Sequence, residues 1–158
     1  MSERVTLTLS EVLMATAAGA VRHMEAVRAG RRDRHGFEGD GLSAHILGAC
    51  GEIAVGKLTG MYWGGESGTF KKSDIGHDVQ IKTRSLEWHD LIVRHDDADD
   101  HRFVLVTGSP PCLTVHGWVW GREAKQPGYL KPHGGRPEAY FVPQSALRAM
   151  RVRAEVAA

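Results

Sequence analysis

The segment Leu42–Leu58 constrains the fold of this chain more than any other segment. Its apolar residues recur around most of a helical circumference, which is typical of a helix buried on several sides. Gly48, Gly51 and Gly56 lie inside it, although each glycine lowers helix propensity by about 1 kcal/mol. Glycines kept at that cost indicate close approach of another backbone. We therefore expect a helix over Leu42–Leu58 that packs tightly against a β-sheet.

The composition is that of an ordinary globular protein. The chain has 158 residues, of which 42% are apolar and 25% charged, so we expect one domain over residues 1–158 with one core. The net charge of +1 requires any DNA-binding surface to be a local patch. Cys50 and Cys112 form no disulfide framework, and no segment resembles a signal peptide or a membrane span. These features predict a cytoplasmic protein without membrane contact.

The remaining patterns predict an α+β fold. A first helix is expected from Ser10, as N-cap, to about Ala29, and a last helix from Pro143. Between them we expect a central mixed, mostly antiparallel sheet flanked by helices. The first helix carries an apolar stripe at helical spacing, formed by Leu13, Ala17, Val21, Met24 and Val27. The expected strands are Asp78–Arg84, Leu91–Arg94, Arg102–Thr107, Leu113–Trp120 and Tyr140–Val142, with a further short strand around Thr69–Lys71.

Several segments resemble known sites only in part. The acidic segment Asp96–Asp100 lacks the glycine and the bidentate acid of a calcium loop, so we expect a hairpin tip there. Gly121–Ala124 is expected as a turn or short helix, and Gln126–Pro137 as a loop. The nine histidines show no zinc spacing, and no phosphate-binding glycine motif occurs. A zinc site built from scattered histidines is the weakest alternative.

The strand Asp78–Arg84 carries the most unusual set of side chains. Because strand side chains alternate between faces, the polar residues point one way and the apolar or β-branched residues the other. The polar set is Asp78, Gln80, Lys82 and Arg84, and the other set is Val79, Ile81 and Thr83. The second set suits a core, whereas the first set is too charged for one.

Glu52 lies in the middle of the apolar helix and must be paired, protonated or bound to a metal. Pairing with a core arginine is one alternative, and His45 lies on a similar face. The other is a magnesium site shared with Asp74, because magnesium prefers one or two carboxylates together with water and phosphate. An ammonium group such as that of Lys82 orients the attacking water in phosphodiester hydrolysis. The backbone carbonyl of Ile81 is a further candidate ligand.

At these residues the chain resembles the PD-(D/E)XK nuclease superfamily, in a small prokaryotic or phage-type form. The matching segments are Gly48-Ala-Cys-Gly-Glu52-Ile-Ala-Val-Gly56, Ser73-Asp74-Ile-Gly76 and Gln80-Ile-Lys82-Thr-Arg84. The resemblance covers roughly residues 42 to 107 and implies a restriction-endonuclease-like core. It also implies Glu52 and Asp74 near Mg²⁺, or Mn²⁺ as a substitute, and Lys82 near the attacking water.

The chain departs from the family pattern in three ways, of which the mildest is Ser73 in place of proline before Asp74. Gln80 replaces the second acid, so it would offer only a neutral oxygen, with Asp78 on the same face as the compensating carboxylate. The spacing from Asp74 to Gln80 is short, which leaves open a tight turn or a metal bound by Asp78 instead of Asp74. The expected phosphate contacts are Lys71, Lys72 and Arg84, with the basic cluster at Arg31 and Arg32, for which a solvated helix end is the alternative.

These observations predict a magnesium-dependent deoxyribonuclease, more an endonuclease than an exonuclease, with DNA as its partner. The alternative is a non-catalytic nucleic-acid- or protein-binding domain derived from the same fold, in which Glu52 and Lys82 form a buried ion pair. Tyr62 and Trp63 are expected to cap the core rather than stack on bases. The sequence leaves open whether the protein is a homodimer. Many nucleases that cut both strands are dimers, but we identify no apolar helical seam that indicates a dimer interface.

Overall fold

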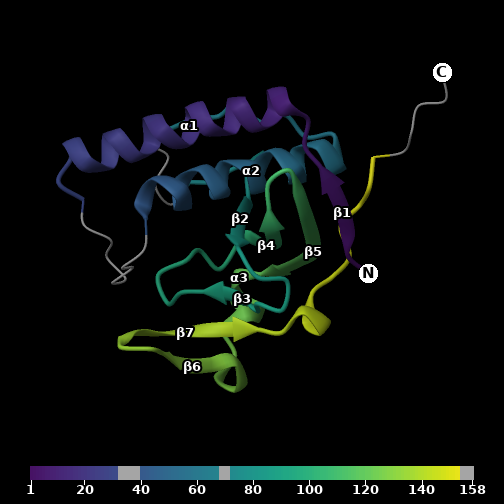
Figure 1. Cartoon of the computed structure of the whole chain (residues 1–158). Coiled ribbons are helices and arrows are strands. Elements are labelled where there is room, and N and C mark those ends of the chain that lie inside the picture. Colours follow the sequence, from purple (N-terminus) through teal and green to yellow (C-terminus); the bar gives the residue numbers. More distant parts are fainter. Residues whose placement is uncertain (32–39, 68–71, 154–158) are drawn as a thin grey trace.

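The computed structural model describes residues 1–31, 40–67 and 72–153, and it has the α+β fold expected from the sequence. Two long helices stack on one face of a four-stranded sheet, and a three-stranded sheet covers the other face (Figure 1). Helix α1 spans Leu9–Arg28 and α2 spans Gly41–Thr59. The helix α2 lies between α1 and the sheet, so α1 is the outermost layer (Figure 1).

The first sheet has the strand order β1-β5-β4-β2. Its strands are β1 (Glu3–Thr6), β5 (Cys112–Trp120), β4 (Arg102–Ser109) and β2 (Val79–Arg84). The β2–β4 pair is parallel and the other two pairs are antiparallel, which confirms the prediction of a mixed, mostly antiparallel sheet. The two long helices both lie on one face of this sheet.

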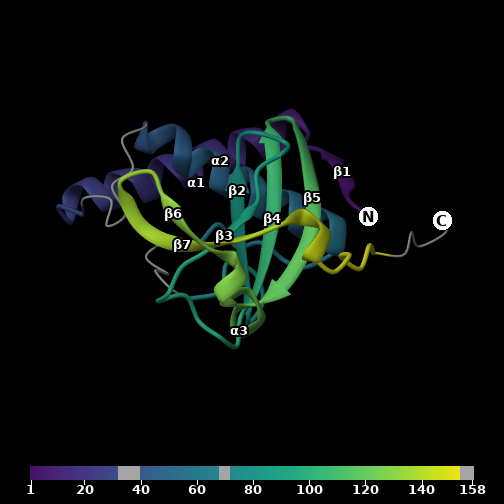
Figure 2. The same cartoon turned by 90° about the horizontal axis from the view of Figure 1, so that it is seen from below.

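The second sheet has the order β3-β7-β6 and lies across the other face of the first (Figure 2). Its strands are β3 (Leu91–Val93), β7 (Arg136–Val142) and β6 (Leu130–His133). The short helix α3 (Gly121–Ala124) and the 3₁₀ turns η1 (Pro127–Tyr129) and η2 (Gln144–Ala146) complete the described elements. Among the described residues, no helix is both long and apolar enough to cross a membrane.

Strand alternation divides the interior into two cores. In β4, Val104 and Val106 face the helices, whereas Phe103 and Leu105 face the second sheet. Val79 and Ile81 of β2 join the helix-side core, as the alternation predicts. Each face of the first sheet is thus sealed by apolar side chains.

The glycines of α2 explain how closely this helix approaches the sheet. A Cβ atom on Gly51 would lie 1.9 Å from Oγ1 of Thr83, and one on Gly56 would lie 3.0 Å from the carbonyl oxygen of Met61. The predicted close packing is therefore confirmed at these two positions. It is wrong at Gly48, where an added Cβ meets nothing within 4 Å.

Helix α1 begins two residues earlier than expected, because its N-cap is Thr8, in a capping box with Glu11, rather than Ser10. Its inward side consists of small residues, because a Cβ on Gly19 would lie 2.7 Å from the backbone of Ile46 in α2. The apolar stripe read from the sequence lies on the outward side instead, with Leu13 61% exposed and Met24 56% exposed.

Other sequence predictions are also corrected. The acidic segment Asp96–Asp100 is not a hairpin tip, because β3 pairs with β7 and β4 belongs to the other sheet. The expected loop Gln126–Pro137 contains η1, β6 and the start of β7, and the helix expected from Pro143 is only the turn η2. Strand β1 was not expected at all. The strand expected at Thr69–Lys71 lies outside the described residues.

Candidate functional site

Asp74 begins a tight turn that leads directly into β2. Its N–H donates to the carbonyl oxygen of Val79 at 2.7 Å, and Ile75 forms a bridge with the same residue. Gly76 takes φ +64° at the tip, a conformation that glycine adopts without strain. The short spacing between Asp74 and Gln80 is therefore a tight turn, one of the two alternatives left open by the sequence.

The Asp74 carboxylate caps the free edge of β2. Its Oδ2 accepts a hydrogen bond from the N–H of Ile81 at 2.6 Å, and β2 is the end strand of its sheet, with β4 on its other side. The N–H and C=O groups of one strand residue point to the same side. The carbonyl oxygen of Ile81 therefore faces the edge on which Asp74 lies.

The surroundings of Asp74 raise its pKa to about 6. Burial is the main cause, and the negative charge of Glu52 adds to it; the hydrogen bond from Ile81 and the charges of Lys82 and Arg22 act in the opposite direction. The carboxyl thus titrates near neutral pH between a second acid and two cations. Perturbed titration of this kind is typical of functional sites.

Glu52 is buried, with 5% of its surface exposed, and its carboxylate is already paired. Nη1 and Nη2 of Arg22 each donate to one of its oxygens at 2.8 Å, and Nε1 of Trp63 donates to Oε2 at 2.7 Å. The arginine pairing that the sequence left open is therefore the one observed. A carboxylate has about four acceptor positions, so Glu52 keeps about one for a further ligand.

Arg22 also joins three parts of the chain. Its Nε and Nη2 donate to the carbonyl oxygen of Glu66 at 3.1 and 2.9 Å, which ties α1 and α2 to the loop after α2. Sequence reasoning missed this residue. The available signal was the series Ala15, Gly19 and Arg22, which recurs at helical spacing on the inward side of α1.

Asp78 and Gln80 do not join Asp74. Both oxygens of Asp78 are held by Arg102 of β4, at 2.6 and 2.8 Å, and this pairing lowers the pKa of Asp78. The amide nitrogen of the buried Gln80 lies 3.1 Å from Nδ1 of His101 and 3.4 Å from the carbonyl oxygen of Lys72. A glutamate could not donate to that carbonyl, which gives a structural reason for an amide here.

Lys82 lies on the face of β2 that looks toward the second sheet. Its Nζ is 3.4 Å from Oδ1 of Asp97 and 5.4 Å from the centre of the Phe103 ring. The alternative prediction of a buried Glu52–Lys82 ion pair is therefore wrong, because Glu52 pairs with Arg22 and Lys82 lies beside Asp97. Asp97 is a further acid near the site that sequence reasoning assigned only to a hairpin tip.

The residues expected to contact phosphate differ in how far their side chains are exposed to solvent. Lys72 and Arg31 are exposed. Arg84 is half-buried and donates to the carbonyl oxygen of Asp90 at 2.8 Å, and burial lowers the pKa of its guanidinium. Lys71 and Arg32 lie outside the described residues.

The donor set at this edge suits magnesium better than zinc. Within residues 1–31, 40–67 and 72–153, no three His, Cys, Asp or Glu side chains are grouped as a metal site. The Asp74 carboxylate and the backbone carbonyl of Ile81 share this edge, and the charge of Glu52 acts on Asp74 by raising its pKa. Oδ1 of Asp74 accepts no hydrogen bond from the described residues. Hard oxygen ligands in this small number fit Mg²⁺, which keeps several waters and binds substrate phosphate.

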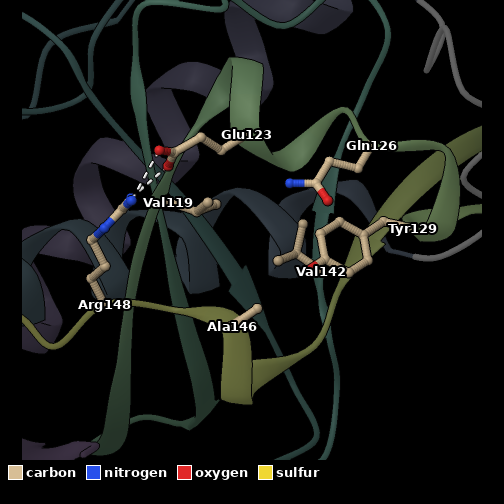
Figure 3. Close-up of a pocket in the computed structure, with 7 residues that line it drawn as sticks. All are labelled: Val119, Glu123, Gln126, Tyr129, Val142, Ala146 and Arg148. Atoms are coloured by element: carbon tan, nitrogen blue, oxygen red, sulfur yellow. Dashed lines mark hydrogen bonds and ion pairs between the residues drawn. The ribbon is translucent and has the colours of Figure 1, made fainter.

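A separate pocket of about 260 Å³ lies between α3, η1 and η2 (Figure 3). It is lined by Val119, Glu123, Gln126, Tyr129, Val142, Ala146 and Arg148. The one carboxylate in this lining, Glu123, is paired with Arg148, whose Nη2 lies 2.9 Å from its Oε1 (Figure 3). The pocket therefore offers no unpaired acid for metal binding or proton transfer.

Comparison with protein-family models, with curated protein sequences and with solved structures gives no match to this chain.

Proposed function

We propose that this protein is a magnesium-dependent deoxyribonuclease that hydrolyses phosphodiester bonds within DNA. The observation that carries the proposal is the Asp74 carboxyl at the free edge of β2. Its pKa is raised to about 6, one of its oxygens accepts no hydrogen bond from the described residues, and Glu52 and Lys82 act on its charge. The carbonyl oxygen of Ile81 faces the same edge.

Asp74, Glu52 and the Ile81 carbonyl are the groups that would hold the metal. When bound, Mg²⁺ or Mn²⁺ would lower the pKa of a water and offset charge on the non-bridging phosphate oxygens. The hydrogen bond from the N–H of Ile81 fixes the orientation of the Asp74 carboxylate before any ligand arrives. Such pre-orientation is what a weakly held hard cation needs.

Lys82 is proposed to position the attacking water and to balance charge as the phosphate reacts. Its charge already lowers the pKa of Asp74, which supports a location within reach of the same edge. The exposed Lys72, which directly precedes the Ser73–Asp74 turn, is proposed to contact DNA phosphate. Neutralising one phosphate this way adds affinity without base specificity.

A second candidate is a non-catalytic nucleic-acid- or protein-binding domain. The observation that favours it is the closed hydrogen bonding of Glu52, which Arg22 and Trp63 satisfy without a metal. In that case the acid stabilises the helix packing, and Gln80 holds the backbone at Lys72 through its amide.

Metal binding separates the two candidates, and calorimetric titration with Mg²⁺ measures it directly. Asp74→Asn should abolish binding, because it removes the charge of the carboxylate whose Oδ1 accepts no hydrogen bond from the described residues. Asp78→Asn is the matched control, four residues away in the same turn, and should bind as wild type because Asp78 is held by Arg102. No heat of binding in the wild-type protein, or equal loss in both variants, contradicts the proposal.

Cleavage is then tested on supercoiled, linear and branched DNA with Mg²⁺ or Mn²⁺. Wild-type protein should nick or cut at least one form, and Lys82→Ala should reduce the rate by about 10²-fold or more. Lys131→Ala, which changes an exposed lysine on β6, is the control and should cut at the wild-type rate. Metal binding without cleavage of any form would favour the non-catalytic candidate.

A further inference from the structure

Helix α1 presents an apolar face that no described element covers. Six large apolar side chains on it are each more than half exposed, and α1 is the outermost layer of the fold (Figure 1). They are Leu9, Leu13, Met14, Val21, Met24 and Val27. A contiguous exposed face of this kind marks an interaction surface.

The placement of large and small residues on α1 is the reverse of that on an ordinary surface helix. Its inward side uses Ala15 and Gly19 to approach α2 closely, and its large apolar residues point outward. An ordinary amphipathic helix turns its large apolar residues to the core and polar residues to water. The outward residues of α1 therefore contribute little to the packing of this chain on itself, and a partner has to cover them.

The spacing on this face is that of a helix-pairing seam. Positions alternate at intervals of three and four residues over almost the full 20-residue helix, which is about 30 Å long. The seam consists of Ser10, Leu13, Ala17, Ala20, Met24 and Val27. Two alanines form its centre, Leu13 and Met24 flank them, and Ser10 and Val27 lie at its ends.

The seam is also complementary to itself. About a two-fold axis midway between Ala18 and Gly19, which is the middle of α1, Leu13 meets Met24 of a second copy and Ala17 meets Ala20. The two alanines let the helix axes approach closely, and the larger residues pack on either side of them. Self-complementarity under a two-fold axis is the requirement of an isologous dimer interface.

We propose that this protein forms a homodimer in which the α1 helices of two copies pack antiparallel along this seam. Antiparallel pairing also sets the two helix dipoles in opposition, which favours it over parallel pairing. A helix pair alone covers less than the roughly 800 Å² per partner of a standard interface. The dimer is therefore in reversible equilibrium with monomer. This inference is independent of the proposed function, because Arg22 and the candidate site lie on the other side of α1.

Sedimentation velocity over a range of protein concentrations tests the dimer. Wild-type protein should shift from monomer to dimer as concentration rises. Ala17→Glu places a charged side chain against Ala20 of the second copy on each side of the axis, with the two glutamates about one helical turn apart, and should weaken association on the order of a hundredfold. Ala44→Glu makes the same change at an exposed position of α2 and should associate as wild type. Monomeric wild-type protein, or equal association of all three proteins, overturns the proposal; thermal melting confirms that each is folded.

Cysteine cross-linking tests the orientation, in a Cys112→Ser background because Cys112 is exposed. A mixture of Leu13→Cys protein with Met24→Cys protein should form a disulfide-linked heterodimer. Neither protein alone should cross-link, because an antiparallel pair separates identical positions by eleven residues of helix, beyond the reach of a disulfide. Cross-linking of Leu13→Cys to itself, without the heterodimer, would contradict the antiparallel arrangement.

Discussion

The carboxylate of Glu52 and the guanidinium of Arg22 form a bidentate pair, with both N–O distances at 2.8 Å. The pair joins α2 to α1 at the side of the molecule where Asp74 caps β2. Arg22 thereby offsets the charge that Glu52 places on Asp74, since the two act in opposite directions on the pKa of that carboxyl. In the candidate site, Arg22 and Trp63 therefore occupy most of the acceptor positions of Glu52, whereas Oδ1 of Asp74 accepts no hydrogen bond from the described residues.

Removing Arg22 should destabilise the protein strongly. Arg22→Met leaves the Glu52 carboxylate buried without its cation, which costs about 3–5 kcal/mol of unfolding free energy. Urea denaturation measures it. The double variant Arg22→Met/Glu52→Gln should recover much of the loss, because the uncompensated charge is gone. Additive losses in the double variant would show that the two side chains act independently.

Asp74→Asn should stabilise the protein above pH 6 and have little effect near pH 4. The folded-state pKa of Asp74 is about 6, above its ordinary 3.8, so the folded protein binds this proton more tightly than the unfolded chain. Stability from this group is therefore complete below pH 3.8 and is lost as pH rises through 6. The asparagine variant avoids a loss of about 3 kcal/mol, since one pKa unit corresponds to about 1.4 kcal/mol. Thermal or urea unfolding as a function of pH measures the difference.

Asp78→Asn is the control with the opposite sign. Pairing with Arg102 lowers the pKa of Asp78, so this acid stabilises the fold at neutral pH and loses that effect in acid. The asparagine variant should be less stable than wild type at neutral pH, and the gap should narrow as pH falls. Identical pH profiles for the two variants would refute the assigned environments.

Magnesium affinity should increase as pH rises through about 6. A metal ligand must be deprotonated, and Asp74 loses its proton in that range. Calorimetric titration on either side of pH 6 tests this, and the dependence should disappear together with binding in Asp74→Asn. Tight binding that does not change across this range would mean that another group holds the metal.

Two glycines in α2 should respond to alanine in opposite ways. Gly51→Ala should destabilise by about 1–3 kcal/mol, because its Cβ would lie 1.9 Å from Oγ1 of Thr83. Gly48→Ala should stabilise by about 0.5–1 kcal/mol, since nothing lies within 4 Å and alanine favours the helix. Thr83→Ala should relieve part of the Gly51→Ala defect in the double variant. Chemical denaturation of the four variants measures these changes in the free energy of unfolding.

Local patterns in the sequence predicted α2 and the two faces of β2. The apolar residues and glycines of α2 and the alternation through Val79 and Ile81 each have one physical solution, namely burial against a neighbouring element. The same reasoning related Glu52 to Asp74 across distant segments, and the charge of Glu52 raises the pKa of Asp74.

The sequence misled where two faces of one element were both compatible with burial. The large apolar residues of α1 do not by themselves determine which side of the helix faces the rest of the protein. Contact with α2 selects the side with Ala15 and Gly19, because small residues allow the two backbones to approach closely. Strand β1, with one buried valine in four residues, carries too little pattern to be recognised.

Composition and periodicity were sufficient for the α+β class and for the polar strand that carries Lys82. The partners of those polar groups came only from the folded chain: Arg22 on Glu52, Arg102 on Asp78, and Ile81 on Asp74. A charged side chain selects its partner by distance in space, and residues thirty positions apart become neighbours only after two helices pack. For that reason the choice of Asp74 over Asp78 as the acid at the open edge belongs to tertiary structure.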